Sequence, residues 1–66
     1  MIDTKFLRER RCQEGLRLKD MAEKLGYESP NGYWRLERGL TKLRVEHLVK
    51  LARVFGEPIE KFIRGV

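Results

Sequence analysis

Apolar residues recur at helical spacing along most of this chain, and they almost nowhere alternate with polar residues as they would in a half-buried strand. The two clearest stripes are Leu18, Met21, Ala22 and Leu25, and then Val45, Leu48, Ala52 and Phe55. A glycine follows each stripe, and glycine commonly ends a helix. The pattern therefore predicts helices over residues 17–25 and 44–55, each with an inward apolar face.

Weaker signals predict three further helices. Phe6 and Leu7 anchor one over residues 4–14, although Arg10 occupies an inner position, where its stem would pack while its charged head reaches a partner. Ser29 and Pro30 are typical of an N-cap and a first helical residue, which predicts a helix over 30–38.

The last predicted helix covers residues 58–64 and opens at Pro58. Its apolar face would hold Ile59, Phe62, Ile63 and Val66. These side chains would serve either as core or as a partner surface, with core favoured for Ile59 and Phe62.

Five short helices with glycine-marked turns predict an all-α fold, a compact five-helix bundle. With 66 residues, we expect residues 1–66 to form a single domain, too small to enclose a substrate pocket beside its core.

The charge composition limits the class of binding partner. The formal net charge of +5 favours a polyanion. No apolar run approaches the roughly 20 residues that span a bilayer, and residues 1–10 lack the apolar core of a signal peptide, so a cytoplasmic protein is expected.

Candidate chemistry is sparse. The single cysteine, Cys12, has no disulfide partner and no second thiolate for a zinc site, and no base is evident near it. The single histidine, His47, falls on the polar side of its helix. Both are interpreted as surface residues, so we expect no enzyme, no metal and no cofactor, and no small-molecule ligand is evident.

The helix over 30–38 has two distinct faces. Tyr33 and Leu36 point one way, with Leu40 beyond them. The opposite side carries Asn31, Trp34, Arg35 and Arg38. Asparagine and arginine can hydrogen-bond base edges in the major groove, and an outward tryptophan usually has a contact that explains it. These four residues are the predicted base contacts.

A family resemblance then becomes specific. The stretch from Gly15 to Gly26, GLRLKDMAEKLG, closely resembles the second helix and turn of Cro and phage C1-repressor type helix-turn-helix regulators, the XRE-like family. Leu36-Glu37-Arg38-Gly39 is similar to the end of their third helix, and the segment over 45–62 is similar to their fourth and fifth helices. The resemblance covers about residues 7–63 and implies a lambda-repressor-like DNA-binding domain.

The resemblance also implies roles for single residues. Ala22 would let the second and third helices cross closely. Glu37 would pair with an arginine of the first helix, for which the family spacing favours Arg11 and the helical wheel favours Arg10. The phosphate contacts would be Arg17, Lys19, Lys42 and Arg44.

Three positions depart from the family pattern. Leu18 stands where many members have a glutamine, one extra residue separates Gly26 from Glu37, and Trp34 replaces a small polar residue. The indole could contact a thymine methyl group or a sugar, or it could serve a protein partner.

The predicted function is that of a sequence-specific regulator of double-stranded DNA, a repressor, bound as a homodimer to a pseudo-palindrome. Self-contact would come from Phe62, Ile63 or Val66 if these do not close the core. The alternative is a protein-interaction module with the same fold, such as an antitoxin or an accessory regulator.

Overall fold

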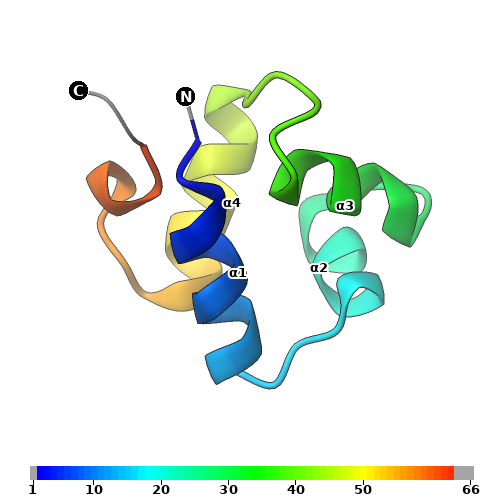
Figure 1. Ribbon diagram of the computed structural model, residues 1–66, viewed down its shortest axis with the longest axis horizontal. Coiled ribbons are helices and arrows are strands. Elements are labelled where there is room, and N and C mark those ends of the chain that lie inside the picture. Colours follow the sequence, from blue (N-terminus) through cyan, green and yellow to red (C-terminus); the bar gives the residue numbers. More distant parts are fainter. Residues whose placement is uncertain (1, 64–66) are drawn as a thin grey trace.

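The computed structural model describes residues 2–63, which form four α-helices and one short 3-10 helix (Figure 1). The elements are α1 (Thr4–Gln13), α2 (Leu18–Leu25), α3 (Pro30–Glu37), α4 (Val45–Phe55) and the 3-10 helix η1 (Ile59–Phe62). Each α-helix begins and ends within one residue of the range that periodicity predicts. In Figure 1, α2 and α3 lie together on one side of the molecule and η1 lies on the other.

Local chemistry explains where these helices begin and end. The Asp3 carboxylate accepts a hydrogen bond from the Phe6 backbone N–H at 3.1 Å and so caps α1. α2 and α4 both end at a glycine in the left-handed conformation, Gly26 with φ of 83° and Gly56 with φ of 62°. Other residues are strained at such φ values, so these glycines stop the helices and turn the chain.

A single cluster of apolar side chains joins all five elements. Its buried members are Ile2, Leu7, Met21, Ala22, Leu25, Tyr33, Leu36, Leu48, Leu51, Phe55 and Phe62. α2 packs against α3 and α4, while η1 packs against α1 and α4. The fully buried Phe62 ring meets the Phe6 ring edge-on at 5.3 Å and lies 6.1 Å from the Phe55 ring.

The prediction of a fifth α-helix over 58–64 is wrong. Only Ile59–Phe62 are helical, as one 3-10 turn, and Ile63 is extended and pairs with Ile2 in an antiparallel bridge. The Asp3 N–H donates to the Phe62 carbonyl at 2.8 Å. This pairing of the chain's two ends takes the place of further helical turns. Residues 64 and 66 lie outside the described part of the chain.

Three apolar side chains expected on inner faces are exposed instead. Val45 is 77% exposed because it begins α4, and the inner face of that helix is formed by Leu48, Leu51 and Phe55. Leu40 is 59% exposed because α3 ends at Glu37 and its periodicity does not extend further. Ile59 is 37% exposed, so the core at this end is closed by Phe62.

Candidate nucleic-acid interface

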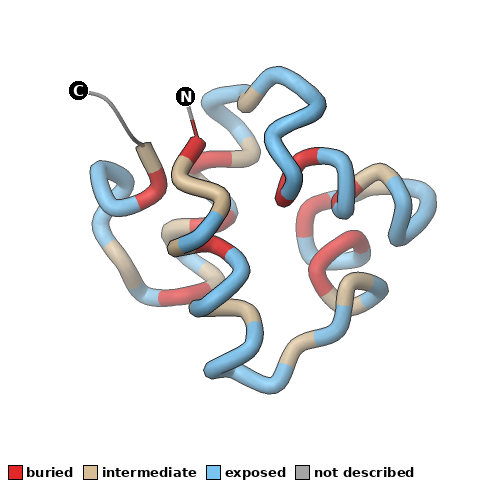
Figure 2. The backbone as a smooth tube through the Cα atoms, viewed as in Figure 1, coloured by how far each residue is buried: buried red, intermediate tan, exposed pale blue. Residues whose placement is uncertain are grey.

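α3 is held by its inner face and presents its outer face to solvent. Tyr33, Leu36 and Glu37 are buried against the rest of the molecule. The four side chains predicted to contact bases, Asn31, Trp34, Arg35 and Arg38, are all exposed. Buried and exposed stretches alternate along α3 in Figure 2, and the segment that follows it is exposed. The outer face therefore combines one amide, one indole and two guanidinium groups.

Two of these side chains are in contact with each other. The Arg38 guanidinium carbon lies 5.4 Å from the centroid of the Trp34 ring, which is the geometry of a cation–π contact. Trp34 is 38% exposed. Within residues 2–63 neither Arg35 nor Arg38 forms an ion pair, so their positive charges are available to an anionic partner.

The end of α3 is anchored to α1 by an ion pair. Arg11 Nε lies 2.8 Å and its Nη2 3.0 Å from the two carboxylate oxygens of Glu37, which is only 4% exposed. Arg11 Nη1 also donates to the Leu16 carbonyl at 3.0 Å, just before α2. The hydrogen bond with Glu37 raises the pKa of Arg11. This planar, two-point contact fixes the orientation of α3 relative to α1 and leaves both residues outside the exposed face.

Arg10, the other residue considered for that pair, has different partners. Its Nε lies 2.8 Å from a carboxylate oxygen of Glu57 and its Nη2 donates to the Phe55 carbonyl at 2.9 Å. Its guanidinium also lies over the Phe55 ring, at 5.5 Å from the centroid. Its charged head therefore reaches a partner within the fold, at the end of α4.

The four predicted phosphate contacts fall on two segments. Arg17 and Lys19 flank the first residue of α2, and Lys42 and Arg44 lie in the segment between α3 and α4. All four are exposed. Arg17 lies 3.4 Å from Asp20 and Arg44 lies 3.7 Å from Glu46, and exposed pairs of this kind add little to stability and separate readily.

Lys42 and Arg44 line a polar hollow of about 550 Å³ between the end of α2 and the start of α4. The hollow also contains Lys50, Tyr27 and His47, and the sequence alone did not indicate that these three lie together. Lys50 adds a third cation on the next turn of α4. No sequence spacing links Tyr27 with His47, because the turn after α2 brings them together across 20 residues.

The rings of Tyr27 and His47 are in tilted contact, with an interplanar angle of 36°, and the two side chains are also within hydrogen-bond distance. Their ring centroids are 4.9 Å apart, and the Tyr27 hydroxyl lies 3.2 Å from His47 Nδ1. Burial lowers the pKa of His47, so the neutral ring is favoured. His47 is half-buried in the wall of the hollow, and Cys12 is exposed.

With this geometry established, the comparison with known families gives one result. The sequence model described as "Helix-turn-helix" matches residues 7–62. The chain belongs to the Cro and C1 type helix-turn-helix family. No curated protein and no solved structure gave a significant match. Within the family, α2 and α3 are the two helices of the motif, and members of this family are DNA-binding regulators.

The structure gives a physical setting for two of the three departures from the family pattern, Leu18 and the segment between Gly26 and Glu37. Leu18 begins α2 and is half-buried against the core, so it packs where a glutamine would offer a polar group. In that segment the Tyr27 ring, from the turn after α2, packs against α3 at Gly32. A Cβ on Gly32 of α3 would come within 2.8 Å of the Tyr27 ring, so glycine is what permits this close approach.

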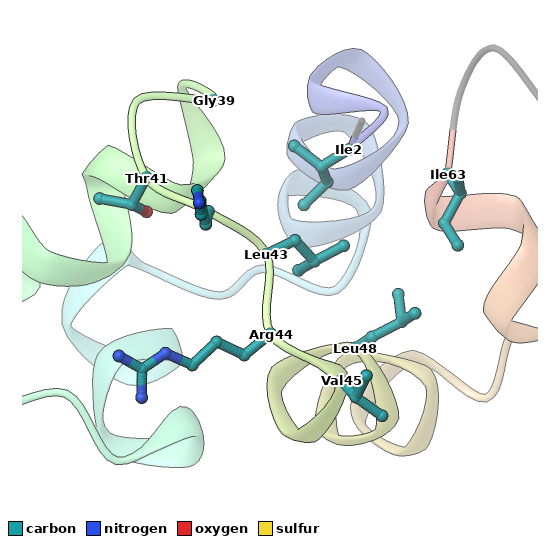
Figure 3. A pocket seen from close by; sticks show the side chains of 9 residues that line it. Ile2, Gly39, Thr41, Leu43, Arg44, Val45, Leu48 and Ile63 are labelled. Atoms are coloured by element: carbon teal, nitrogen blue, oxygen red, sulfur yellow. The ribbon is translucent and has the colours of Figure 1, made fainter.

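The second hollow of this helix-turn-helix protein is an apolar groove of about 470 Å³ (Figure 3). Its lining is Ile2, Gly39, Thr41, Lys42, Leu43, Arg44, Val45, Leu48 and Ile63. Figure 3 shows the Arg44 side chain pointing away from the apolar members. Among residues 2–63, no helix has the length and apolar character needed to cross a membrane.

Proposed function

We propose that this protein is a sequence-specific transcriptional repressor that reads the major groove of double-stranded DNA with α3. The observation that carries the proposal is the exposed face of α3, which presents Asn31, Trp34, Arg35 and Arg38 on a helix held by a buried opposite face. Arginine and asparagine form two-point hydrogen bonds with guanine and adenine in that groove. In this proposal the bound protein represses by occupying promoter DNA.

The basic segments on either side of α3 support the same proposal. Arg17 and Lys19 at α2, and Lys42 and Arg44 after α3, would each neutralise a phosphate and so set the position of α3 on the duplex. The cations of the polar hollow, including Lys50, would add to this sequence-independent attraction.

We further propose that two copies bind two half-sites related by a two-fold axis. One domain of this size contacts only a few base pairs, and two-fold pairing doubles the length of DNA that is read. Phe62 is fully buried in the core and therefore unable to supply the self-contact considered from sequence. The exposed Val45 beside the apolar groove supports a contact on that face instead.

The decisive experiment measures binding to random-sequence duplex DNA across a salt series. Wild type should bind with an affinity that falls steeply with salt, because each neutralised phosphate releases counterions. The double variant Arg35→Ala, Arg38→Ala should bind weakly and with a shallower slope. The charge-matched control Arg8→Ala, Arg53→Ala removes two exposed arginines from α1 and α4 and should retain both the affinity and the slope.

Sequence reading is separated from phosphate attraction by single variants. Arg35→Ala should weaken binding to a preferred duplex by about 1 to 3 kcal/mol, whereas Lys42→Ala should lower affinity for all duplexes alike. Equal losses on preferred and random duplexes would remove Arg35 from the reading role. Absence of DNA affinity for wild type at low salt would overturn the proposal and favour a protein-interaction module, with Trp34 as its contact residue.

A further inference from the structure

The exposed face of α3 contains a single large apolar group, the indole of Trp34. Asn31, Arg35 and Arg38 around it are polar or charged. The Arg38 guanidinium packs over the indole at 5.4 Å, and the ring still has 38% of its surface exposed. Because one partner already lies over the ring, the indole is held in place before any ligand arrives.

The chemistry of a DNA duplex restricts what this indole can contact. Stacked bases hide their faces, so the part of each base that a side chain in the major groove can contact is its edge. Those edges carry hydrogen-bond donors and acceptors and a single apolar group, the C5-methyl of thymine. An indole carries one N–H donor, and the rest of its surface matches that methyl group alone.

We propose that Trp34 is a specificity-determining residue that contacts the C5-methyl group of a thymine in each half-site. Arg38 acts as a positioning residue, because its guanidinium holds the indole in the orientation that the contact requires. The proposal rests on the proposed DNA-reading function and adds the base that one side chain recognises. The contact distinguishes thymine from cytosine, and also from uracil, which has the same hydrogen-bonding groups and lacks only the methyl.

The test uses that last difference. Duplexes are first selected with wild-type protein from a pool with 20 random base pairs, and a preferred duplex is synthesised from the result. Each thymine is then replaced, one at a time, by deoxyuridine, and affinities are measured by fluorescence anisotropy. At one position in each half-site, loss of the methyl should weaken wild-type binding about fourfold, the affinity equivalent of one buried methyl group.

Variants assign that methyl effect to a side chain. Trp34→Ala should bind the thymine and deoxyuridine duplexes equally, while Trp34→Phe should retain part of the difference. Arg38→Ala should reduce the ratio of the affinities for the thymine and deoxyuridine duplexes without bringing it to one. Loss of one positive charge alone would weaken binding to both duplexes equally and leave this ratio unchanged. Arg35→Ala, on the same face, should bind more weakly and keep the ratio. Circular dichroism melting checks that each variant is folded.

The outcomes distinguish this inference from the function on which it rests. Sequence preference without any effect of deoxyuridine, or with a preferred site that lacks thymine, overturns the role of Trp34 and leaves the regulator function standing. A methyl effect that persists in Trp34→Ala assigns the contact elsewhere and also overturns it. If selection enriches no sequence, the proposed sequence-specific function itself fails.

Discussion

Single residues in this small domain differ in how much their replacement changes stability, and buried polar residues are among the most sensitive. Glu37 is almost fully buried, yet both carboxylate oxygens accept hydrogen bonds from Arg11. Removing one partner of such a pair costs more than the pair contributes, because the other charge is left buried alone. The hydroxyl of Tyr33 lies in the same region with no hydrogen-bond partner among residues 2–63.

Tyr33→Phe should therefore leave the fold intact and raise the free energy of unfolding by about 1 kcal/mol, since it removes a buried hydroxyl without a partner and keeps the ring. Burial, followed by the charge of the nearby Glu37 carboxylate and its interaction with the hydroxyl, raises the pKa of Tyr33, so the hydroxyl is neutral in the fold. The two groups are nevertheless not placed in hydrogen-bonding geometry. Urea unfolding measures the change. Tyr33→Ala is the contrast and should lose about 3 to 5 kcal/mol. A loss above 1 kcal/mol for Tyr33→Phe would show that the hydroxyl is bonded.

His47 predicts how stability depends on pH. Burial lowers the pKa of His47 in the fold below its unfolded value of 6.5, with Lys50 and Arg44 also lowering it and Glu46 opposing them. As pH falls below about 6.5, the unfolded chain takes up a proton before the folded one does, so the free energy of unfolding decreases until the folded ring is also protonated. Above that window the stabilisation is fully present.

Thermal melting between pH 5 and 8 measures this effect of His47. Wild type should melt at lower temperature toward the acidic end, and His47→Gln, which stays neutral, should lose most of that dependence. His47 is the only histidine in the chain, and Asp20, whose pKa is lowered from 3.8, titrates below this range. An unchanged pH profile in His47→Gln would contradict the assignment.

At the scale of elements, the pairing of α2 with α3 sets the direction of the exposed face. Ala22 is 2% exposed and belongs to the shared core with Met21 and Leu25. Tyr27 then packs on Gly32 and reaches His47, which ties the turn after α2 to α3 and α4. The orientation of α3 thus depends on small residues at its points of close approach.

Ala22→Leu should destabilise the protein by about 1 to 3 kcal/mol, because three added carbon atoms have no space in a packed helix contact. Glu23→Leu provides a matched control, since it introduces the same side chain at the neighbouring, exposed position. That change should stay within about 0.5 kcal/mol of wild type. Equal effects of the two variants in urea unfolding would show that α2 does not pack tightly at Ala22.

Sequence periodicity predicts where the helices lie, but it does not predict what packs against each of their faces. The stripe from Leu18 to Leu25 predicts α2 and its buried face, because every position of that stripe meets another element. Val45 shares a side of α4 with Leu48 but nothing covers it, and periodicity indicates which residues share a side without saying what lies against that side. Helical spacing over residues 58–64 predicts a full helix there. Periodicity within one segment gives no sign that Ile63 pairs with Ile2, 61 residues earlier, and this pairing ends the helix after one turn.

For the candidate site, likewise, the sequence predicts one helical face but not the contacts between distant segments. One helical face can be read from one segment, so Asn31, Trp34, Arg35 and Arg38 could be grouped without a structure. Other contacts depend on how the turn after α2 folds. These are the tilted contact between Tyr27 and His47 and the position of Lys50 in the same hollow. Contacts of that kind have no periodic signature in the sequence.

At the scale of the whole molecule, cationic and apolar surface meet in the segment between α3 and α4, where Lys42 and Arg44 also line the apolar groove. The net charge of +5 and the cations around α3 suit a polyanion. Val45 and the apolar groove beside it form a neighbouring surface that combines a projecting side chain with a hollow. A two-fold contact requires a surface that complements itself, and a projection beside a hollow meets that requirement.

Val45→Lys should therefore disrupt pairing while the fold survives, because a side chain that is 77% exposed contributes little to the core of one copy. The groove is lined by nine residues, whereas a standard interface uses roughly 20 to 30 residues on each side, so pairing should be weak in solution and strongest on DNA. Binding of wild type to a duplex with two half-sites should be cooperative, and Val45→Lys should bind each half-site independently.

The comparison uses titrations on duplexes with one and two half-sites, and the added positive charge should not weaken binding to a single half-site. Arg53→Lys, an exposed position elsewhere on α4, should remain cooperative. Cooperative binding by Val45→Lys would place the contact between copies on another surface.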